Sequence, residues 1–221
     1  AEQWYHIVVI KNGDGASNLS FYLNGQSDGV ASVGSVTTPS GEKRIGIWTE
    51  SASNPFYGLM DDFRVYNRAL SGQEVLNLYS SSGEALGILN TAHRNTLTNG
   101  LVGYWTFDGP MVSGTIARDS SPYNNNGTLT NGPTRTIGRL GQALDFDGND
   151  DWVDVPDGTA VALNTSEGSV CTWVYPVAYP ASVSASGRGN IFEAWQGASD
   201  VGFLVFVGSG GLFFGQYVGD T

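Results

Sequence analysis

The chain has 221 residues and a formal net charge of −11; only 14% of its residues are charged, whereas 12% are aromatic and 31 are glycine. This composition favours short strands joined by tight turns over a helical protein. The acidic balance argues against nucleic acid as a partner, since phosphate binding needs clustered Lys and Arg, and the longest apolar run, within residues 201–208, is too short to insert into a membrane as a helix.

The first part of the chain alternates strand patterns with turns and contains one helix signal. Strand-like runs, rich in β-branched and aromatic residues, occupy residues 1–10, 19–25, 42–49 and 56–70. Ser71 and Glu74 have the spacing of a capping box, in which the Ser hydroxyl and the Glu carboxylate satisfy the first free amides of a helix. We therefore predict a short helix over residues 72–79.

Residues 83–100 are small and polar, with no strong period, and are interpreted as a linker. After this segment, residues 116–130 form a long polar turn. Strand patterns resume at residues 101–109, 141–156, 169–176, 190–196, 201–208 and 211–219. At least nine strands and one short helix predict an all-β protein with an antiparallel β-sandwich, or jelly-roll, architecture.

Several of these segments resemble the motifs of a known domain family. GLVGYWTFDG, ARDSSPYNNNGTL, LGQALDFDGNDDWVDVPD and VCTWVYP, in the second part of the chain, resemble the opening of a laminin-G-like domain of the concanavalin A-like jelly-roll superfamily. WYHIVVIKNG, LSFYLNGQ and GLMDDFRVYNRALSGQEVLNLY, in the first part, resemble its later strands, closing strand and terminal helix. Together these motifs cover most of the chain and imply a concanavalin A-like sandwich.

The motifs stand in a permuted order. Residues 1–82 resemble the C-terminal half of such a domain, residues 83–100 join the halves, and residues 101–221 resemble the N-terminal half. Three explanations stay open: one period of a tandem array cut at an arbitrary point, a unit that exchanges halves with its neighbours, or a circular permutant that closes on itself. The first two make neighbouring copies of the chain, arranged head to tail, its partners.

The acidic residues suggest a cation. Asp61 and Asp62 lie in one strand pattern, where adjacent side chains point to opposite faces, and an inward carboxylate is costly unless it is paired or bound to a metal. The resemblance implies a structural Ca²⁺ between the opening and closing strands, and the matching ligands are Asp62, Asp108, Asp119 and the turn through Asn124. The alternative is a hydrogen-bonded acidic pair without metal. Residues 147–151 are also rich in oxygen ligands, but we interpret them as a solvated hairpin turn.

Catalytic patterns are missing from the sequence. The Glu-x-Asp-x-x-Glu spacing of related glycan hydrolases does not occur, and Glu193 is the one Glu within an apolar strand pattern. A retaining glycosidase needs two carboxyl groups about 5 Å apart. Cys171 has the surroundings of a buried small apolar residue. We therefore predict that the protein is not an enzyme; a degenerate glycan hydrolase is a weak third alternative.

Two further kinds of site are considered. Aromatic side chains could stack on a carbohydrate, and sequons could accept a glycan. The aromatic candidates for stacking on a sugar are Trp48, Tyr57, Trp195 and Tyr217, although the tryptophans of a sandwich more often belong to its core. Three matches to the N-x-S/T acceptor pattern, all predicted in turns, are Asn18, Asn126 and Asn164.

These observations predict a non-catalytic module, extracellular or exposed on the cell surface, that acts as a repeating structural or adhesive unit of a surface fibre or large surface protein. The alternative is a discrete carbohydrate-binding lectin module. Because this family serves both glycan binding and adhesion, the fold alone does not decide between them.

Overall fold

The computed structural model describes residues 3–13, 15–33, 43–48, 54–80, 96–155, 167–177, 188–194, 201–208 and 211–218. For residues 15–17, 33, 188, 194, 201–208 and 211–218 it describes the backbone alone.

Within these residues the chain forms strands, one α-helix and one short 3-10 helix. In chain order they are β1 (Tyr5–Asn12), β2 (Gly15–Leu23), β3 (Gln26–Val33), β4 (Lys43–Ile45), β5 (Tyr57–Tyr66), α1 (Gly72–Ser80), β6 (Leu101–Trp105), η1 (Gly109–Met111), β7 (Val112–Ser113), β8 (Ile116–Ala117), β9 (Gly127–Thr130), β10 (Thr134–Ile137), β11 (Gln142–Asp147), β12 (Trp152–Val155), β13 (Glu167–Pro176), β14 (Arg188–Ala194), β15 (Val201–Gly208) and β16 (Gly211–Val218).

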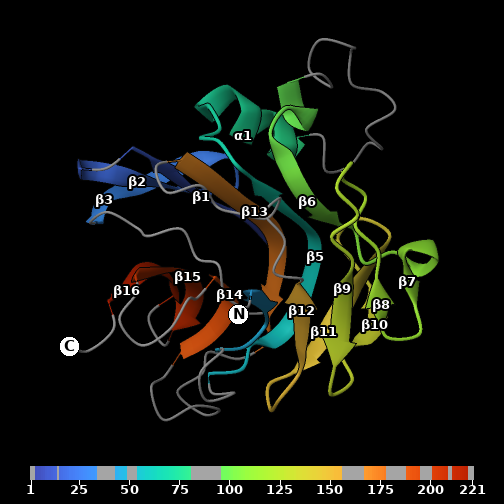
Figure 1. Ribbon diagram of the computed structural model, residues 1–221. Helices are drawn as coiled ribbons and strands as arrows, with labels where there is room; N and C mark the ends of the chain where they lie inside the picture. Colours follow the sequence, from blue (N-terminus) through green and yellow to red (C-terminus); the bar gives the residue numbers. More distant parts are fainter. Residues whose placement is uncertain are drawn as a thin grey trace.

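The strands form two sheets, which we call sheet A and sheet B (Figure 1). Sheet A has the order β10-β11-β5-β13-β1-β2-β3, with β6 also paired to β5, and sheet B has the order β16-β15-β14-β4-β12-β9-β8-β7. Neighbouring strands are antiparallel, so the predicted antiparallel β-sandwich is confirmed.

Alternation along β1 shows how the sandwich is layered. Ile7 and Val9 face the core between the sheets, where they join residues such as Ile45 of sheet B, whereas Val8 and Ile10 face the opposite side. There they meet a second cluster that includes α1, which covers this outer face of sheet A in Figure 1. Both faces of β1 are therefore buried, which explains its almost uninterrupted apolar sequence.

The two parts of the chain that the sequence analysis distinguishes alternate within sheet A. Strand β13, from the second part, lies between β1 and β5 of the first part. The other edge of β5 pairs with β11 along Tyr57–Met60 and with β6 along Phe63–Tyr66. Strands of both parts thus complete one another within one chain.

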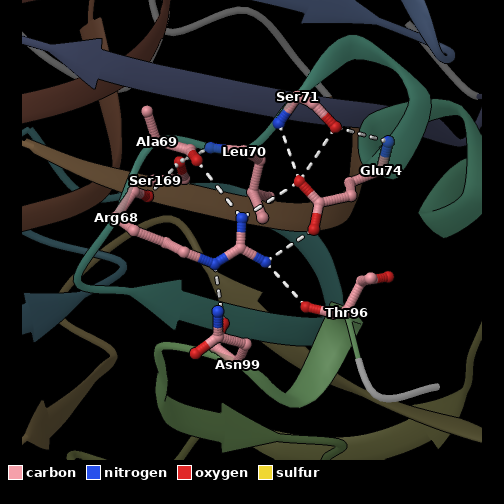
Figure 2. Close-up of polar contacts among 8 residues, drawn as sticks. All are labelled: Arg68, Ala69, Leu70, Ser71, Glu74, Thr96, Asn99 and Ser169. Atoms are coloured by element: carbon pink, nitrogen blue, oxygen red, sulfur yellow. Dashed lines mark hydrogen bonds and ion pairs between the residues drawn. The ribbon is translucent and has the colours of Figure 1, made fainter. Parts of the chain in front are cut away.

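The predicted helix is confirmed as α1, and its capping box forms. The Ser71 hydroxyl accepts a hydrogen bond from the Glu74 amide at 3.3 Å, and a Glu74 carboxylate oxygen accepts one from the Ser71 amide at 2.9 Å. Figure 2 shows that Arg68 joins this cap through two hydrogen bonds to the Glu74 carboxylate, at 2.7 and 3.0 Å.

The same guanidinium also holds the chain that enters β6. It donates to the Thr96 carbonyl at 2.7 Å and to the Asn99 carbonyl at 2.8 Å (Figure 2). Residues 96–98 form a helical turn whose Leu97 is buried against the α1 cluster. The described end of the segment interpreted as a linker is therefore a packed part of the fold.

The strand predictions fail where strands are short or polar. In the strand predicted at residues 42–49, the described residues 43–48 contain only the three-residue β4, and the segment 116–130, predicted as a turn, contains β8 and β9. Strand β3 follows Gly25 closely and is almost wholly exposed, so it has no apolar alternation to reveal it. Pairing to a neighbouring strand, rather than burial of its own side chains, holds such a segment.

In the part of the chain that is described, no helix has the length and apolar character needed to cross a membrane.

Candidate functional site

The most polar region of the sandwich interior lies where β5 changes partners. Opposite Thr172 of β13 the register shifts, so that β5 places two residues, Asp62 and Phe63, against one. Asp62 adopts a left-handed backbone conformation with φ of 58°. Because this bulge interrupts the alternation of side chains, both Asp61 and Asp62 are buried, whereas alternation predicts that one of them points outward.

Asp62 is fully engaged by protein donors. Its carboxylate accepts a hydrogen bond from Arg64 Nη2 at 2.7 Å and another from the Tyr104 hydroxyl at 2.6 Å. The Arg64 guanidinium also lies over the Tyr104 ring, 4.3 Å from its centroid. Burial works against the charged guanidinium, but the Asp62 carboxylate together with Tyr104, Tyr66 and Cys171 outweighs it and raises the pKa of Arg64. Asp62 thus joins β5 to β6 through its bond to Tyr104.

Asp61 differs from its neighbour. Its side chain is 0% exposed; Oδ2 accepts a hydrogen bond from the Leu140 amide at 2.7 Å, and Oδ1 is buried without a hydrogen-bond partner. Burial raises the pKa of Asp61 to about 8, and the negative charges of Asp62 and Asp108 add to the effect. A buried carboxylate with an unused oxygen near a second carboxylate is an environment that a cation would stabilise.

Asp108 reaches the same turn from the segment after β6. Its Oδ1 accepts a hydrogen bond from the Gln142 amide at 2.8 Å. The turn approaches both carboxylates so closely that a side chain at Gly138 would meet Asp61 Oδ2, and one at Gly141 would collide with Asp108. Asp61 and Asp108 therefore share the turn of residues 138–142.

This arrangement allows a test of the Ca²⁺ prediction. Calcium is bound by hard oxygen ligands, and the unused oxygen of Asp61 together with Asp108 fits that requirement. Among the residues predicted as ligands, Asp108 lies in this arrangement, but the structure brings Asp61 to it rather than Asp62, whose oxygens are engaged by Arg64 and Tyr104.

Asp119, another predicted ligand, organises a turn. Its two oxygens accept hydrogen bonds from the Tyr104 amide, from the amide and hydroxyl of Ser121, and from the Asn125 amide, at distances of 2.6 to 2.8 Å. Asn124 lies exposed in the same turn, with φ of 57°. Asp119 therefore fixes the turn against β6, and it does not join a group of three acidic side chains within the described residues.

The described residues contain one group of three acidic side chains that lie close together, in the turn between β11 and β12. Asp147, Asp150 and Asp151 place one carboxylate oxygen each within 4.8 Å of one another. Asp147 and Asp150 are exposed, as the predicted solvated hairpin requires, whereas Asp151 is buried. A hydrogen bond from the Asn149 side chain lowers the pKa of Asp147, and burial raises that of Asp151. The turn could hold a cation. The close spacing of its aspartates in the sequence is the feature that indicates such a site.

Two of the four aromatic residues predicted to stack on a sugar lie within the described residues, and both are packed against the fold. Trp48 is only 9% exposed, and the half-buried Tyr57 packs beside Gly148. Trp195 and the side chain of Tyr217 lie outside the described residues. The described members of the set are thus parts of the packed structure.

The predicted sequons differ in their surroundings. Asn18 is buried in β2, and its amide donates to the Gly13 carbonyl at 2.9 Å, so its predicted position in a turn is wrong. Asn126 is half-buried just before β9, and its side-chain oxygen accepts a hydrogen bond from the Asp119 amide. Asn164 lies outside the described residues.

Residues considered for catalysis are buried. Burial raises the pKa of Cys171 to about 12 and lowers that of His6 to about 3, and the His6 ring lies 5.1 Å from that of Trp173. Glu193 is 2% exposed in β14. These groups have the surroundings of structural residues, as the sequence predicts for Cys171.

Comparison with known proteins gives one match. Residues 1–76, from before β1 into α1, match the family model Laminin_G_3, described as the concanavalin A-like lectin/glucanases superfamily. No curated protein matches the chain. No solved structure matches it either. The matched third of the chain and the two antiparallel sheets agree with a concanavalin A-like sandwich.

Proposed function

We propose that the protein is a non-catalytic module that acts outside the cell as a repeating structural or adhesive unit. The observation that supports this most is the use of its buried acidic groups. Asp62 and Asp119 both bind donors of β6 and so fasten the second part of the chain to β5 and to its own turns. Acidic groups committed to holding strands together serve stability rather than chemistry.

The same geometry argues against glycan hydrolysis. A retaining mechanism needs two carboxyl groups about 5 Å apart that both face the sugar. Asp61 and Asp108 approach a common turn, but the amides of Leu140 and Gln142 bind them, and Asp61 is 0% exposed. A carboxylate in that position is closed to a sugar ring.

Calcium has a structural role in this proposal. Asp61 and Asp108 are the residues that would hold it, and the bound ion would neutralise two carboxylates and tie β5 to the turn of residues 138–142. The group in the turn between β11 and β12 is the other location at which carboxylates converge. Substitution at Asp61 and at Asp151 separates these two sites.

The partners in this proposal are neighbouring copies of the chain. Within one chain, strands of the two parts pair with each other, so each copy would be a self-contained module, and such modules stacked head to tail build fibres and stalks. The surface location follows from the resemblance to laminin-G-like modules.

The mass of the protein isolated from its natural source tests the repeat. We expect a covalent mass several times the 23.4 kDa of this chain, with peptides of the same sequence recurring along it. A mass that contains this sequence once, in a protein that sediments as a monomer, would contradict the repeating unit. A parallel screen on β-glucans, galactans and xylans should give no turnover, and turnover abolished by Glu193→Gln would overturn the non-catalytic assignment.

A further inference from the structure

The two edge strands of sheet A carry the two most exposed large apolar side chains of the described residues. Ile137 of β10 is 84% exposed, and Val30 of β3 is 62% exposed. No strand among the described residues pairs with the outer edge of either strand, and the two strands lie on opposite sides of the molecule (Figure 1). An apolar side chain on an unpaired strand edge favours pairing with another chain.

The strands β10 and β3 run in the same direction. Sheet A leads from one to the other through six antiparallel pairings, and an even number of reversals restores the direction of the chain. A second copy that continues sheet A would therefore place its β3 parallel to β10 of the first. Because this contact joins two different surfaces, each added copy leaves one edge free for the next.

On the face of sheet A that points to the core, the side chains of the two strands fit one register. Arg135 is paired with the core residue Leu144, so Arg135 and Ile137 both lie on this face. On β3, Ala31 is paired with the core residue Leu19 and packs against the same core. When Ile137 stands beside Ala31 of a second copy, its side chain extends the core of that copy beyond the edge of the sheet.

The same register also suits the outer face and the charges. It places Thr136 beside Val30, two β-branched side chains that both point away from the core. It places Arg135 beside Gly29, where a side chain would meet nothing within 4 Å, so there is room for the guanidinium. The exposed Asp28 precedes Gly29 and is left out of the β2–β3 ladder. Its negative charge complements that of Arg135.

We propose that β10 of one copy pairs in parallel with β3 of a second copy, so that sheet A continues from copy to copy. This inference rests on the proposed repeating unit and names the surfaces through which its copies meet. Strand β10 has only four residues and supplies few backbone hydrogen bonds, so a single contact is weak. Covalent linkage of the copies would strengthen it, because each edge then faces its partner at a high effective concentration.

Sedimentation velocity of the single chain, at concentrations up to about 1 mM, tests the contact. We expect the weight-average sedimentation coefficient of the native chain to rise with concentration. Ile137→Lys and Val30→Lys should each remain monomeric, because a lysine on a strand edge prevents pairing. Leu76→Lys, at an apolar residue of α1 that is 44% exposed, is the matched control and should associate like the native chain.

A mixture of the two variants tests which edges meet. Ile137→Lys keeps an intact β3 and Val30→Lys keeps an intact β10, so an equimolar mixture should form dimers and nothing larger. All three lysine variants should keep the native midpoint of thermal unfolding, because the substituted side chains are exposed. If Val30→Lys dimerises alone while Ile137→Lys does not, two β10 strands pair with each other and the proposal is wrong.

Two further results would overturn the proposal. The first is a native chain that stays monomeric up to about 1 mM, a concentration at which even millimolar affinities are detected. The second is association that persists in both Ile137→Lys and Val30→Lys, which would place the contact elsewhere. Either result leaves the proposed repeat intact, because the covalent mass decides that question, and a mass with a single copy would leave the sedimentation result standing.

Discussion

Asp61 and Asp62 are neighbours in one strand, yet they lie in opposite electrostatic surroundings. Asp62 faces a guanidinium and a phenol, and both of its oxygens are hydrogen-bonded. Asp61 faces the turn of residues 138–142, has one unused oxygen and lies near another carboxylate. The bulge between them, with Asp62 at φ of 58°, separates a carboxylate paired with a guanidinium from one that accepts a hydrogen bond from the backbone.

This difference shows that the role of a carboxylate depends on what the neighbouring strand supplies. Where β5 pairs with β6, the opposite strand supplies Tyr104, and the same strand supplies Arg64. Where β5 pairs with β11, the adjoining turn supplies only backbone amides. Asp62, beside β6, finds its partners within the protein, whereas Asp61, beside the turn of residues 138–142, is stabilised by a proton or a cation.

The largest loss of stability should follow from breaking the Asp62–Arg64 pair. Asp62→Asn or Arg64→Met alone leaves a buried charge without its partner and should lower the free energy of unfolding by about 3–5 kcal/mol. The double variant Asp62→Asn/Arg64→Met leaves no buried charge and should recover part of that loss. Urea unfolding of the four proteins measures the coupling, and additive losses would mean that the pair is not a unit.

Asp61 should make the stability of the protein depend on pH. Folded Asp61 keeps its proton up to about pH 8, whereas an unfolded Asp releases it near about pH 4. In this window the folded state binds more protons, so the free energy of unfolding falls as the pH rises, by at most about 1.4 kcal/mol per pH unit. Thermal unfolding between about pH 6 and 8 should show this fall in the native protein without divalent cations.

Asp61→Asn should flatten that profile and stabilise the protein at the alkaline end. Below pH 6 the buried, neutral His6 acts in the opposite sense, because its pKa is lowered to about 3 and the unfolded chain takes up a proton first. The measurement is therefore confined to the window above it. A native profile that rises with pH in this window would contradict the assignment.

Calcium should stabilise the protein by binding to Asp61. At about a hundred times its dissociation constant, a bound ion adds about 2.7 kcal/mol to the free energy of unfolding. We expect Ca²⁺ to raise the midpoint of thermal unfolding and excess chelator to lower it. The gain should vanish in Asp61→Asn and persist in Asp151→Asn. If Asp151→Asn abolishes it instead, the ion belongs to the turn between β11 and β12.

The smallest effect should come from the Arg68–Glu74 pair. It resembles the Arg64–Asp62 pair in geometry, but its side chains are 21% and 14% exposed, against 10% and 7%. Burial opposes the charge on Glu74, but hydrogen bonds from Arg68 and Ser71 lower its pKa. Because water can solvate the remaining partner, Glu74→Gln should cost only about 1 kcal/mol in urea unfolding. A loss as large as that of Asp62→Asn would show that burial does not set the difference.

Local patterns predicted the elements that depend on local rules. Strand-like runs of apolar and β-branched residues indicated β1 and β5, alternating apolar residues indicated β2, and the Ser71–Glu74 spacing indicated α1. The exchange of Asp61 for Asp62 was not predictable, because the bulge depends on which strands meet β5. Nor was the match between β3 and β10, which are far apart in the sequence and become the two edges of sheet A only through the order of its strands.

Strand β13 of the second part lies between β1 and β5 of the first part, so that the two parts of one chain complete a single sandwich. Val8 of β1 is paired with Cys171 of β13, and both side chains lie in the cluster under α1. In Val8→Cys, a mild oxidant that takes up two electrons should join residues 8 and 171 by a disulfide within the same chain, giving a monomer whose mass falls by two hydrogen atoms. Covalent dimers and higher ladders at low protein concentration, with no internally linked monomer, would contradict this arrangement.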